Sequence, residues 1–507
     1  MATCAQMGKG FAALGNFTCA ECRLKKVLMP GVTPTPQERN MVEKTMVLEM
    51  GQGAESSAAG FAEYTRLERE FSLGLGKFMS TEDEGQRFVL PRHHPEAYKN
   101  FLSWLALERE RAKSLETIQR TAGAFFAKLE LQPMTTLPAV KAHFNDLVKK
   151  VGITHDPATT ATARMLKYIV CTGTAKRFSN LFLRSRENIQ VICEGVGGCR
   201  IGEVCGGGDV HGLLANNTAI LEDLAVGGDP SRRVVVEMKL EHSKTGYSRY
   251  LTMAGTTSTS QIEVANALRT YWREAGMFTE TEVVAGVKVT RPDFYVARVS
   301  LLGMEAGCEQ FEKLVWFLET TINPSASSTA RSTIVDAKRR LAAQDGPHKK
   351  YINVAMGRRR DQNLQRIATQ LSELGFQVTV VAGPLLLGTT GGKYPKVKTM
   401  PLATSSAFAP TKELLTAAWE FATSDPQDPD PDLELGMGEI PKWTTHSLRR
   451  LADTTARRYR EQSGVTADEI DIYFGWNERV LLKAMQYHYA TMSIRERMEH
   501  ARITGFM

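Results

Sequence analysis

Residues 187–205 read ENIQVICEGVGGCRIGEVC, an apolar run, a cluster of glycines and a second short apolar run. This pattern predicts a buried helix, a glycine turn and a second helix that begins around Arg200. An arginine at a helix start that follows a tight turn can bind an anion through two parallel hydrogen bonds. Arg200 is therefore the first candidate for binding a negatively charged group.

The next stretch, RRVVVEMKLEHSKTGYSRYLTM (232–253), has high strand propensity on both sides of residues 243–247. We expect a β-hairpin with Lys244 near its turn. The ammonium group of a lysine at a hairpin tip can reach a leaving oxygen and donate a proton to it.

Two later fragments, THSLRRLADTTA (445–456) and FGWNERVLLKAMQYHY (474–489), add further polar groups. His446 and Arg449 are three residues apart, so on a helix they share a face and can bind one oxyanion. Trp476 provides an indole N–H donor, and Tyr487 or Tyr489 provides a phenol.

These groups form a set that can transfer a phosphodiester without a metal ion. A tyrosine is a weak nucleophile because its usual pKa is about 10, and nearby positive charge favours its phenolate. Two arginines can stabilise charge on the non-bridging phosphate oxygens, while a lysine protonates the departing 5′-oxygen. The product would be a 3′-phosphotyrosyl ester close in energy to the broken bond, so rejoining needs no ATP.

The 507-residue chain has a globular composition, with 42% hydrophobic and 23% charged residues. It lacks an apolar run that could span a bilayer and an N-terminal signal-peptide pattern. Its eight cysteines are too few for a disulfide framework. We therefore expect an intracellular protein without membrane association, in the nucleus of a eukaryote or otherwise in the cytoplasm or nucleoid.

Positive charge is concentrated in one part of the sequence. The whole chain has 63 basic and 56 acidic residues, a net charge of +7, whereas residues 91–190 contain 16 basic and 8 acidic side chains. Such a local excess fits a polyanion partner, because basic groups near phosphates release counterions. A solvated helical face would give the same excess.

The periodicity divides the chain into three parts. Residues 1–90 are turn-rich and predict a loosely ordered leader. Helical spacing starts near Pro95 and predicts a helical domain over 91–178, and a mixed domain is expected over 179–507. The expected fold is mainly α with a small β component, in the α+β class.

Within the mixed domain, a long segment has an α/β pattern of its own. YINVAMG (351–357) and FQVTVVAG (376–383) predict strands on either side of a helix at 360–374. The acidic stretch DPQDPDPD (425–432) predicts a linker that its prolines keep irregular.

Taken in order, the four fragments resemble the motifs of the tyrosine recombinase/integrase family, over about residues 95–255 and 400–490. The resemblance implies a core-binding domain at 91–178 that clamps double-stranded DNA, a catalytic domain at 179–507, and no cofactor or metal. It implies these site residues: Arg200 as the first catalytic arginine, Glu203 as its structural neighbour, Lys244 as general acid, His446 and Arg449 as the His-x-x-Arg pair, Trp476 at the family's His/Trp position, and Tyr487 as nucleophile with Tyr489 as the alternative.

Two spacings depart from the family pattern. Trp476 and Tyr487 are 11 residues apart, two more than is usual, and Tyr489 is further away. Lys244 and His446 are 202 residues apart, which implies a large α/β insertion at about 270–400. The insertion contains the basic groups Lys338–Arg340 and Arg358–Arg360, and its role could be DNA contact, protein contact or neither.

The function implied is that of a site-specific DNA recombinase or integrase of a mobile element, acting as a homo-tetramer on two DNA sites. The same chemistry would serve a type IB topoisomerase or a hairpin telomere resolvase. A catalytically inactive DNA-binding clamp is a third hypothesis. For the tail after Tyr489, packing in trans on a neighbouring subunit and packing on its own domain are both open.

Overall fold

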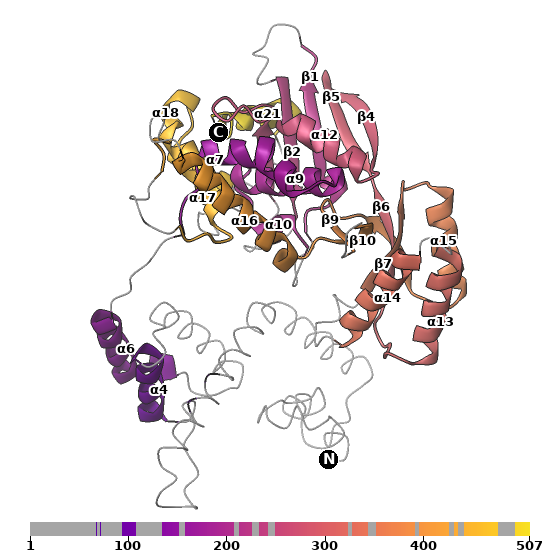
Figure 1. Ribbon diagram of the computed structural model, residues 1–507, viewed down its shortest axis with the longest axis horizontal. Coiled ribbons are helices and arrows are strands. Elements are labelled where there is room, and N and C mark those ends of the chain that lie inside the picture. Colours follow the sequence, from indigo (N-terminus) through magenta and orange to yellow (C-terminus); the bar gives the residue numbers. More distant parts are fainter. Residues whose placement is uncertain are drawn as a thin grey trace, which may run out of the picture. The chain divides into compact units, whose positions relative to one another are not determined.

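The computed structural model describes residues 67, 71, 94–107, 134–151, 158–206, 212–225, 233–241, 249–322, 327–342, 351–390, 395–424, 430–433, 441–474 and 492–506 (Figure 1). The chain forms two compact units, Met1–Pro157 and Ala158–Met507. Both helices and antiparallel sheets are present, so the fold is of the mixed α+β class that the sequence predicts. None of the helices in the described ranges has the length and apolarity needed to cross a membrane.

The first unit is built on helices α4 (Pro95–Leu107) and α6 (Pro138–Val151), with a short 3-10 turn, η2 (Met134–Thr136), before α6. The predicted apolar stripe of α4 forms its core, since Tyr98, Phe101, Leu102 and Leu105 are fully buried. Leu67 and Phe71 pack into the same core, and the Phe71 and Phe101 ring centroids are 5.5 Å apart. The segment predicted as a leader therefore contributes to this core.

The boundary between the units lies after Pro157, and not at residue 178 as the periodicity indicated. Three short helical segments lie between the two positions: α7 (Ala163–Tyr168), η3 (Ile169–Gly173) and α8 (Thr174–Arg177). Met165, Leu166 and Ile169 are fully buried in the main core of the second unit. Helical spacing continues across the boundary, so periodicity alone does not mark it.

A five-stranded antiparallel sheet in the order β3-β2-β1-β5-β4 forms the centre of the second unit. Its strands are β1 (Thr218–Asp223), β2 (Val234–Leu240), β3 (Arg249–Ala254), β4 (Phe278–Val284) and β5 (Val287–Asp293). The pairing of β2 with β3, from Val235↔Ala254 to Leu240↔Arg249, confirms the predicted hairpin. The sheet is preceded by α9 (Leu181–Gly195), α10 (Ile201–Val204) and η4 (Ala215–Asn217).

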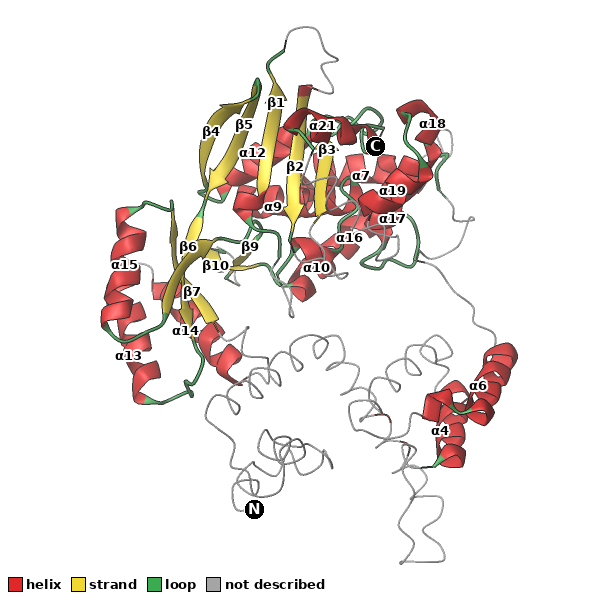
Figure 2. Ribbon diagram, turned by 180° about the vertical axis from the view of Figure 1, so that it is seen from behind, coloured by secondary structure: helices red, strands yellow, loops and turns green. Residues whose placement is uncertain are grey.

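Each face of this sheet packs on different helices, as Figures 1 and 2 show. Val236 and Met253 belong to the main core with α9 and with α12 (Val264–Glu274). Val235 and Val289 point to the other face and pack with Met498 and Ala501 of α21 (Ile494–Glu499) and η7 (His500–Ile503). The C-terminal tail therefore packs on the sheet of its own chain.

Among the described residues, the second unit also contains α16 (Thr404–Thr423), α17 (Ser447–Arg458), α18 (Arg460–Ser463) and α19 (Ala467–Phe474). The described part of the predicted acidic linker is anchored to this body. Asp430 is only 6% exposed and accepts a 2.5 Å hydrogen bond from the Thr162 hydroxyl at the start of α7. Buried acidic groups need such partners, so this part of the stretch is not a free linker.

The predicted insertion contains a second hydrophobic core. Its sheet has the order β7-β6-β8, with β6 (Tyr295–Ser300), β7 (Tyr351–Gly357) and β8 (Val378–Ala382). The core includes residues of α13 (Glu309–Phe317), η5 (Leu318–Ile322), α14 (Ser327–Ala342) and α15 (Gln362–Glu373). The predicted strand–helix–strand order is confirmed, but β4 and β5 belong to the central sheet, so the separate core covers a shorter stretch than 270–400.

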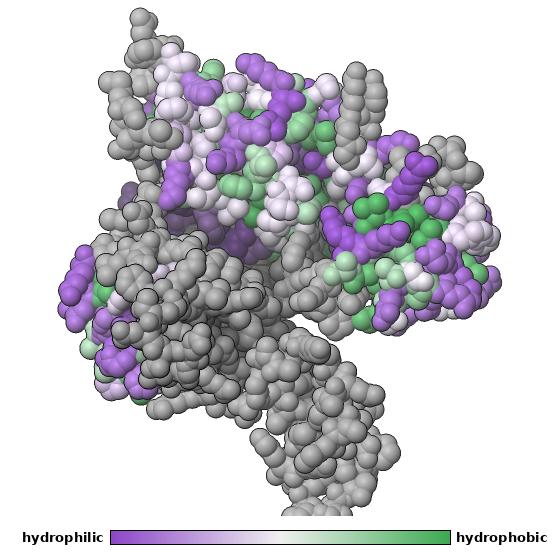
Figure 3. All heavy atoms as spheres, turned by 60° about the horizontal axis from the view of Figure 1, so that its bottom comes forward, coloured by the Kyte–Doolittle hydropathy of each residue, from purple (hydrophilic) through white to green (hydrophobic). Residues whose placement is uncertain are grey.

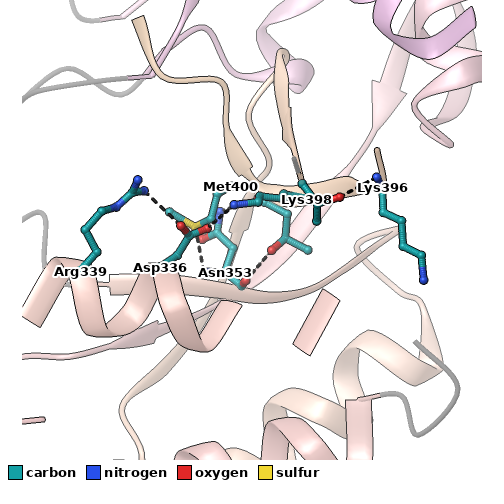
Figure 4. Close-up of polar contacts among 8 residues, drawn as sticks. Asp336, Arg339, Asn353, Lys396, Lys398 and Met400 are labelled. Carbon is teal, nitrogen blue, oxygen red and sulfur yellow. Dashed lines mark hydrogen bonds and ion pairs between the residues drawn. The ribbon is translucent and has the colours of Figure 1, made fainter. Parts of the chain in front are cut away.

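A buried polar network ties this segment to the two-stranded sheet of β9 (Leu387–Thr389) and β10 (Val397–Pro401) (Figure 4). The Asn353 amide donates to the Thr399 carbonyl at 2.9 Å, and the Thr399 hydroxyl donates to the Asn353 carbonyl. The Asp336 carboxylate, in α14, binds Lys398 at 3.1 Å and also Arg339. The segment is therefore fixed to the main body at more than its two ends.

Helix α9 carries two buried carboxyl groups next to α16. Glu187 accepts a 3.1 Å hydrogen bond from the Thr411 hydroxyl, and Glu194 accepts a 3.1 Å bond from the Gln190 amide. Burial raises the pKa of Glu187 to about 7, although the charge of Arg186 opposes the shift. Burial also raises the pKa of Glu194 to about 8, with a further contribution from Glu187. Below about pH 7 both groups therefore favour the protonated form in the folded protein.

This pair should make the folded protein less stable as the pH rises from about 5 to about 9. Between the ordinary carboxyl pKa and the raised values the folded state binds more protons than the unfolded state, so the free energy of unfolding falls with pH. The expected loss is on the order of a few kcal/mol, measured by urea unfolding at each pH. Glu194→Gln should flatten the curve, whereas Glu420→Gln, an exposed change in α16, should not. Parallel curves for wild type and Glu194→Gln would contradict this expectation.

Candidate active site

The turn between α9 and α10 places Arg200 and depends on a glycine. Gly198 has φ +62°, and a Cβ at this position would lie 2.1 Å from the Phe474 ring. The Cys199 N–H donates to the Cys193 carbonyl at 2.9 Å and closes the turn. Arg200 follows in an extended conformation as the N-cap of α10, as the sequence predicts. Only glycine combines this backbone conformation with so close an approach of a ring.

Glu203 holds Arg200 through both of its carboxylate oxygens. Glu203 Oε2 accepts the Arg200 backbone N–H at 2.8 Å, and Oε1 accepts from Arg200 Nη1 at 2.7 Å. The Glu203 side chain is 4% exposed, whereas that of Arg200 is 24% exposed. The carboxylate therefore fixes one side of the guanidinium, while another side reaches solvent and can meet an anion.

Arg449 reaches the same carboxylate from a distant part of the sequence. It lies in the first turn of α17, is 1% exposed, and its Nη1 is 3.7 Å from Glu203 Oε2. Its Nη2 donates to the carbonyl of Phe474 at the end of α19. Two guanidinium groups share one carboxylate, so this cluster has a formal charge of +1. A buried positive cluster is a favourable place for a phosphate.

His446 lies at the N-cap of α17 and is exposed. Its backbone N–H donates to the Thr444 hydroxyl at 3.1 Å, and its carbonyl accepts the Arg450 N–H at 2.9 Å. Helix α17 begins at Ser447, so His446 lies just before the helix and does not share a helical face with Arg449 as the sequence predicted. His446 is nevertheless at the start of the helix whose first turn places Arg449.

Lys244 lies outside the described residues, but both strands of its hairpin are described. A small recess is lined by Glu203 together with Lys239 and Glu241, which lie where β2 leads into the hairpin loop. Lys239 Nζ binds the Glu241 carboxylate at 3.1 Å. Sequence reasoning passed over Lys239, although its place near the end of a predicted hairpin strand was a usable signal.

Trp476, Tyr487 and Tyr489 also lie outside the described residues. The described chain stops before them at Phe474, whose carbonyl binds Arg449, and resumes at Met492. The Met492 carbonyl accepts from Arg497 Nη1 at 3.1 Å, and Arg497 Nε binds Glu237 of β2 at 2.6 Å. Both ends of this segment are therefore attached to the unit that contains the arginine cluster.

No family model matches the sequence, and no curated protein matches it at a significant level. Within the described ranges no group of three or more His, Cys, Asp or Glu side chains is placed to hold a metal ion. The structure brings together Arg200, Glu203 and Arg449 among the predicted site residues. It places His446 at the N-cap of α17, three residues before Arg449.

Proposed function

We propose that the chain is a tyrosine recombinase or integrase of the mobile-element type that cuts and rejoins double-stranded DNA. The observation that carries the proposal is the convergence of Arg200 and Arg449, 249 residues apart, on the buried carboxylate of Glu203. An ion pair on the surface contributes little to stability, and a purely structural pair would need only one arginine. Two held guanidinium groups, one of them partly exposed, suit the non-bridging oxygens of a phosphodiester.

In the proposed reaction the phenol oxygen of Tyr487 attacks phosphorus while the bond to the 5′-oxygen breaks. The phenol proton passes to a base or to water, and Lys244 donates a proton to the departing oxygen. Arg200 and Arg449 stabilise the charge on the non-bridging oxygens, with His446 and Trp476 as further donors. The recess that Glu203 shares with Lys239 and Glu241 supports this assignment of Lys244, and the bond from Arg449 to the Phe474 carbonyl supports that of Trp476.

The first unit supports a contact with duplex DNA. Its helix α6 exposes Lys141, Lys149 and Lys150, within the part of the sequence that has the largest basic excess. Lysine side chains of this kind bind backbone phosphates without reading the sequence. A homo-tetramer on two DNA sites is part of the proposal, because strand exchange between two duplexes requires four cleavages.

Tyr487→Phe should abolish covalent capture of DNA on a nicked suicide substrate, while Tyr489→Phe should leave it intact. The phenylalanine ring keeps the shape of the side chain but removes the only oxygen that can bond to phosphorus. The adduct is measured as a protein band of reduced mobility on a denaturing gel with labelled DNA.

Other outcomes of this assay have distinct meanings. Loss of the adduct only in Tyr489→Phe would move the nucleophile and keep the chemistry. No adduct with wild type on any duplex would overturn the proposal and favour a DNA-binding clamp. Relaxation of a supercoiled plasmid without any joining of two sites would instead indicate a topoisomerase.

A further inference from the structure

A basic groove lies on the second unit, lined by residues of both the central sheet and the insertion. It encloses about 820 Å³ between strands β4 and β5 and the turn that joins β7 to α15. The turn contributes the three consecutive arginines Arg358–Arg360, and β5 contributes Arg291. We propose that this groove binds the phosphate backbone of DNA, as a contact separate from the arginine cluster around Glu203.

The three arginines of the turn are exposed. Within the described ranges no carboxylate oxygen lies within 4.0 Å of their guanidinium nitrogens, while Arg291 is paired with Glu282 at 2.8 Å. Three adjacent like charges repel one another, and an anion in the groove would relieve that repulsion. Such an anion would find donors to which no carboxylate of the described residues is bound.

Two of these guanidinium groups are held by aromatic rings. The Arg358 guanidinium carbon lies 4.0 Å from the centre of the Phe278 ring, and that of Arg359 lies 5.8 Å from the centre of the Tyr295 ring. Stacking on a ring restricts a guanidinium but leaves its N–H edge available for a bidentate bond to phosphate. The rings, which belong to β4 and β6, therefore preorganise two phosphate-binding groups of the same turn.

Three acidic side chains also line the groove, and two of them accept hydrogen bonds from backbone N–H groups. Asp293 Oδ1 accepts the Arg359 N–H at 3.2 Å, and Asp361 Oδ1 accepts the Leu364 N–H at 2.9 Å as the N-cap of α15. Glu280 lies directly across from Arg291 in the β4–β5 register. The aspartates thus fix the shape of the turn that presents the arginines.

The size of the groove and the spread of its charges favour a backbone over a single phosphate ion. The arginines that line the groove come from β5 and from the turn that joins β7 to α15, so its guanidinium groups belong to two separate elements. A DNA strand carries one phosphate per ~3.4 Å of helix axis and can meet several such groups at once. Figure 3 shows that hydrophilic residues share the visible face of the second unit with hydrophobic ones. The choice of DNA as the polyanion rests on the proposed function.

The test is the salt dependence of duplex DNA binding by the full chain, measured by fluorescence anisotropy over a range of KCl concentrations. The triple variant Arg358→Gln, Arg359→Gln, Arg360→Gln should weaken binding about tenfold or more at moderate salt. It should also lower the slope of log affinity against log salt by about two to three. The single variant Arg360→Gln should lower the slope by about one.

A charge-matched control removes three exposed basic groups elsewhere on the insertion, through Lys313→Gln, Arg331→Gln and Arg366→Gln. This control should change the slope of log affinity against log salt by much less than the triple groove variant does. Equal slopes for the two triple variants would overturn the proposal. Arg→Lys at all three groove positions keeps the charge and should keep the slope, which controls for loss of folding. Displacement of the DNA by micromolar ATP or inorganic phosphate would also overturn the proposal, since the groove would then be a small-anion site.

Covalent capture separates this proposal from the proposed function. Suppose that wild type forms no adduct but the triple groove variant loses affinity for DNA as expected. The proposal of a DNA-binding groove then stands, and the proposal of recombinase chemistry fails. If the adduct forms and the triple groove variant binds DNA like wild type, the recombinase chemistry stands and the DNA-binding groove does not.

Discussion

Glu203→Ala should lower the free energy of unfolding by about 3–5 kcal/mol and reduce DNA cleavage by at least about 100-fold. The carboxylate is 4% exposed and is the shared partner of Arg200 and Arg449. Its removal takes away a carboxylate that lies 3.7 Å from the guanidinium of Arg449, which is 1% exposed and lies in a place that water barely reaches. It also releases Arg200 from the orientation that its backbone and side-chain bonds impose.

The matched control is Glu222→Ala. This change removes a carboxylate of β1 that is paired with Lys288 of the neighbouring strand β5 at 3.1 Å. Both partners of that pair are more than a third exposed, so its loss should cost less than about 1 kcal/mol. Urea unfolding gives the stability of each variant, and the suicide-substrate assay gives cleavage. A Glu203→Ala protein as stable as Glu222→Ala would show that the cluster does not depend on this carboxylate.

Gly198→Ala should destabilise the protein by about 2–5 kcal/mol and reduce the yield of covalent adduct. The added Cβ would enter the Phe474 ring, at 2.1 Å from its nearest atom, in a backbone conformation that L-residues rarely adopt. Phe474 must then move, and its carbonyl is the hydrogen-bond acceptor of Arg449. The substitution therefore acts on both arginines of the cluster through one methyl group.

Gly202→Ala provides the control four residues along the chain. A Cβ at Gly202, within α10, would meet nothing within 4 Å. Alanine is the better helix former, so this variant should be as stable as wild type or more stable by up to about 1 kcal/mol. Thermal unfolding of the two variants side by side measures the difference. Similar melting temperatures would mean that the turn can relax around a methyl group.

The parts of the fold that the sequence predicted are those with local signals. The helix, glycine turn and short helix around Arg200 depend on neighbours within twenty residues, as does the β2–β3 hairpin. In the insertion, strand propensity and helical spacing predicted β7, α15 and β8 to within a few residues. Such signals come from backbone propensity and apolar spacing, which do not require knowledge of the tertiary fold.

What the sequence could not predict depends on contacts between distant segments. Nothing near Glu203 indicates that Arg449 will share its carboxylate, and the resemblance supplied that pairing only as an expectation. The unit boundary at Pro157 was missed because α7 has the same helical spacing as the helices before it. The anchoring of Asp430 on Thr162 was missed because an acidic, proline-rich stretch has the composition of a free linker.

The chain leaves the central sheet for the insertion and comes back at adjacent residues: the Gly383 N–H donates to the Phe294 carbonyl at 3.0 Å, and a Cβ at Gly383 would strike the Phe294 ring. A segment that leaves and returns at one place can change in length with little disturbance to the central sheet, provided that the contacts of Asn353 and Asp336 with β10 are kept.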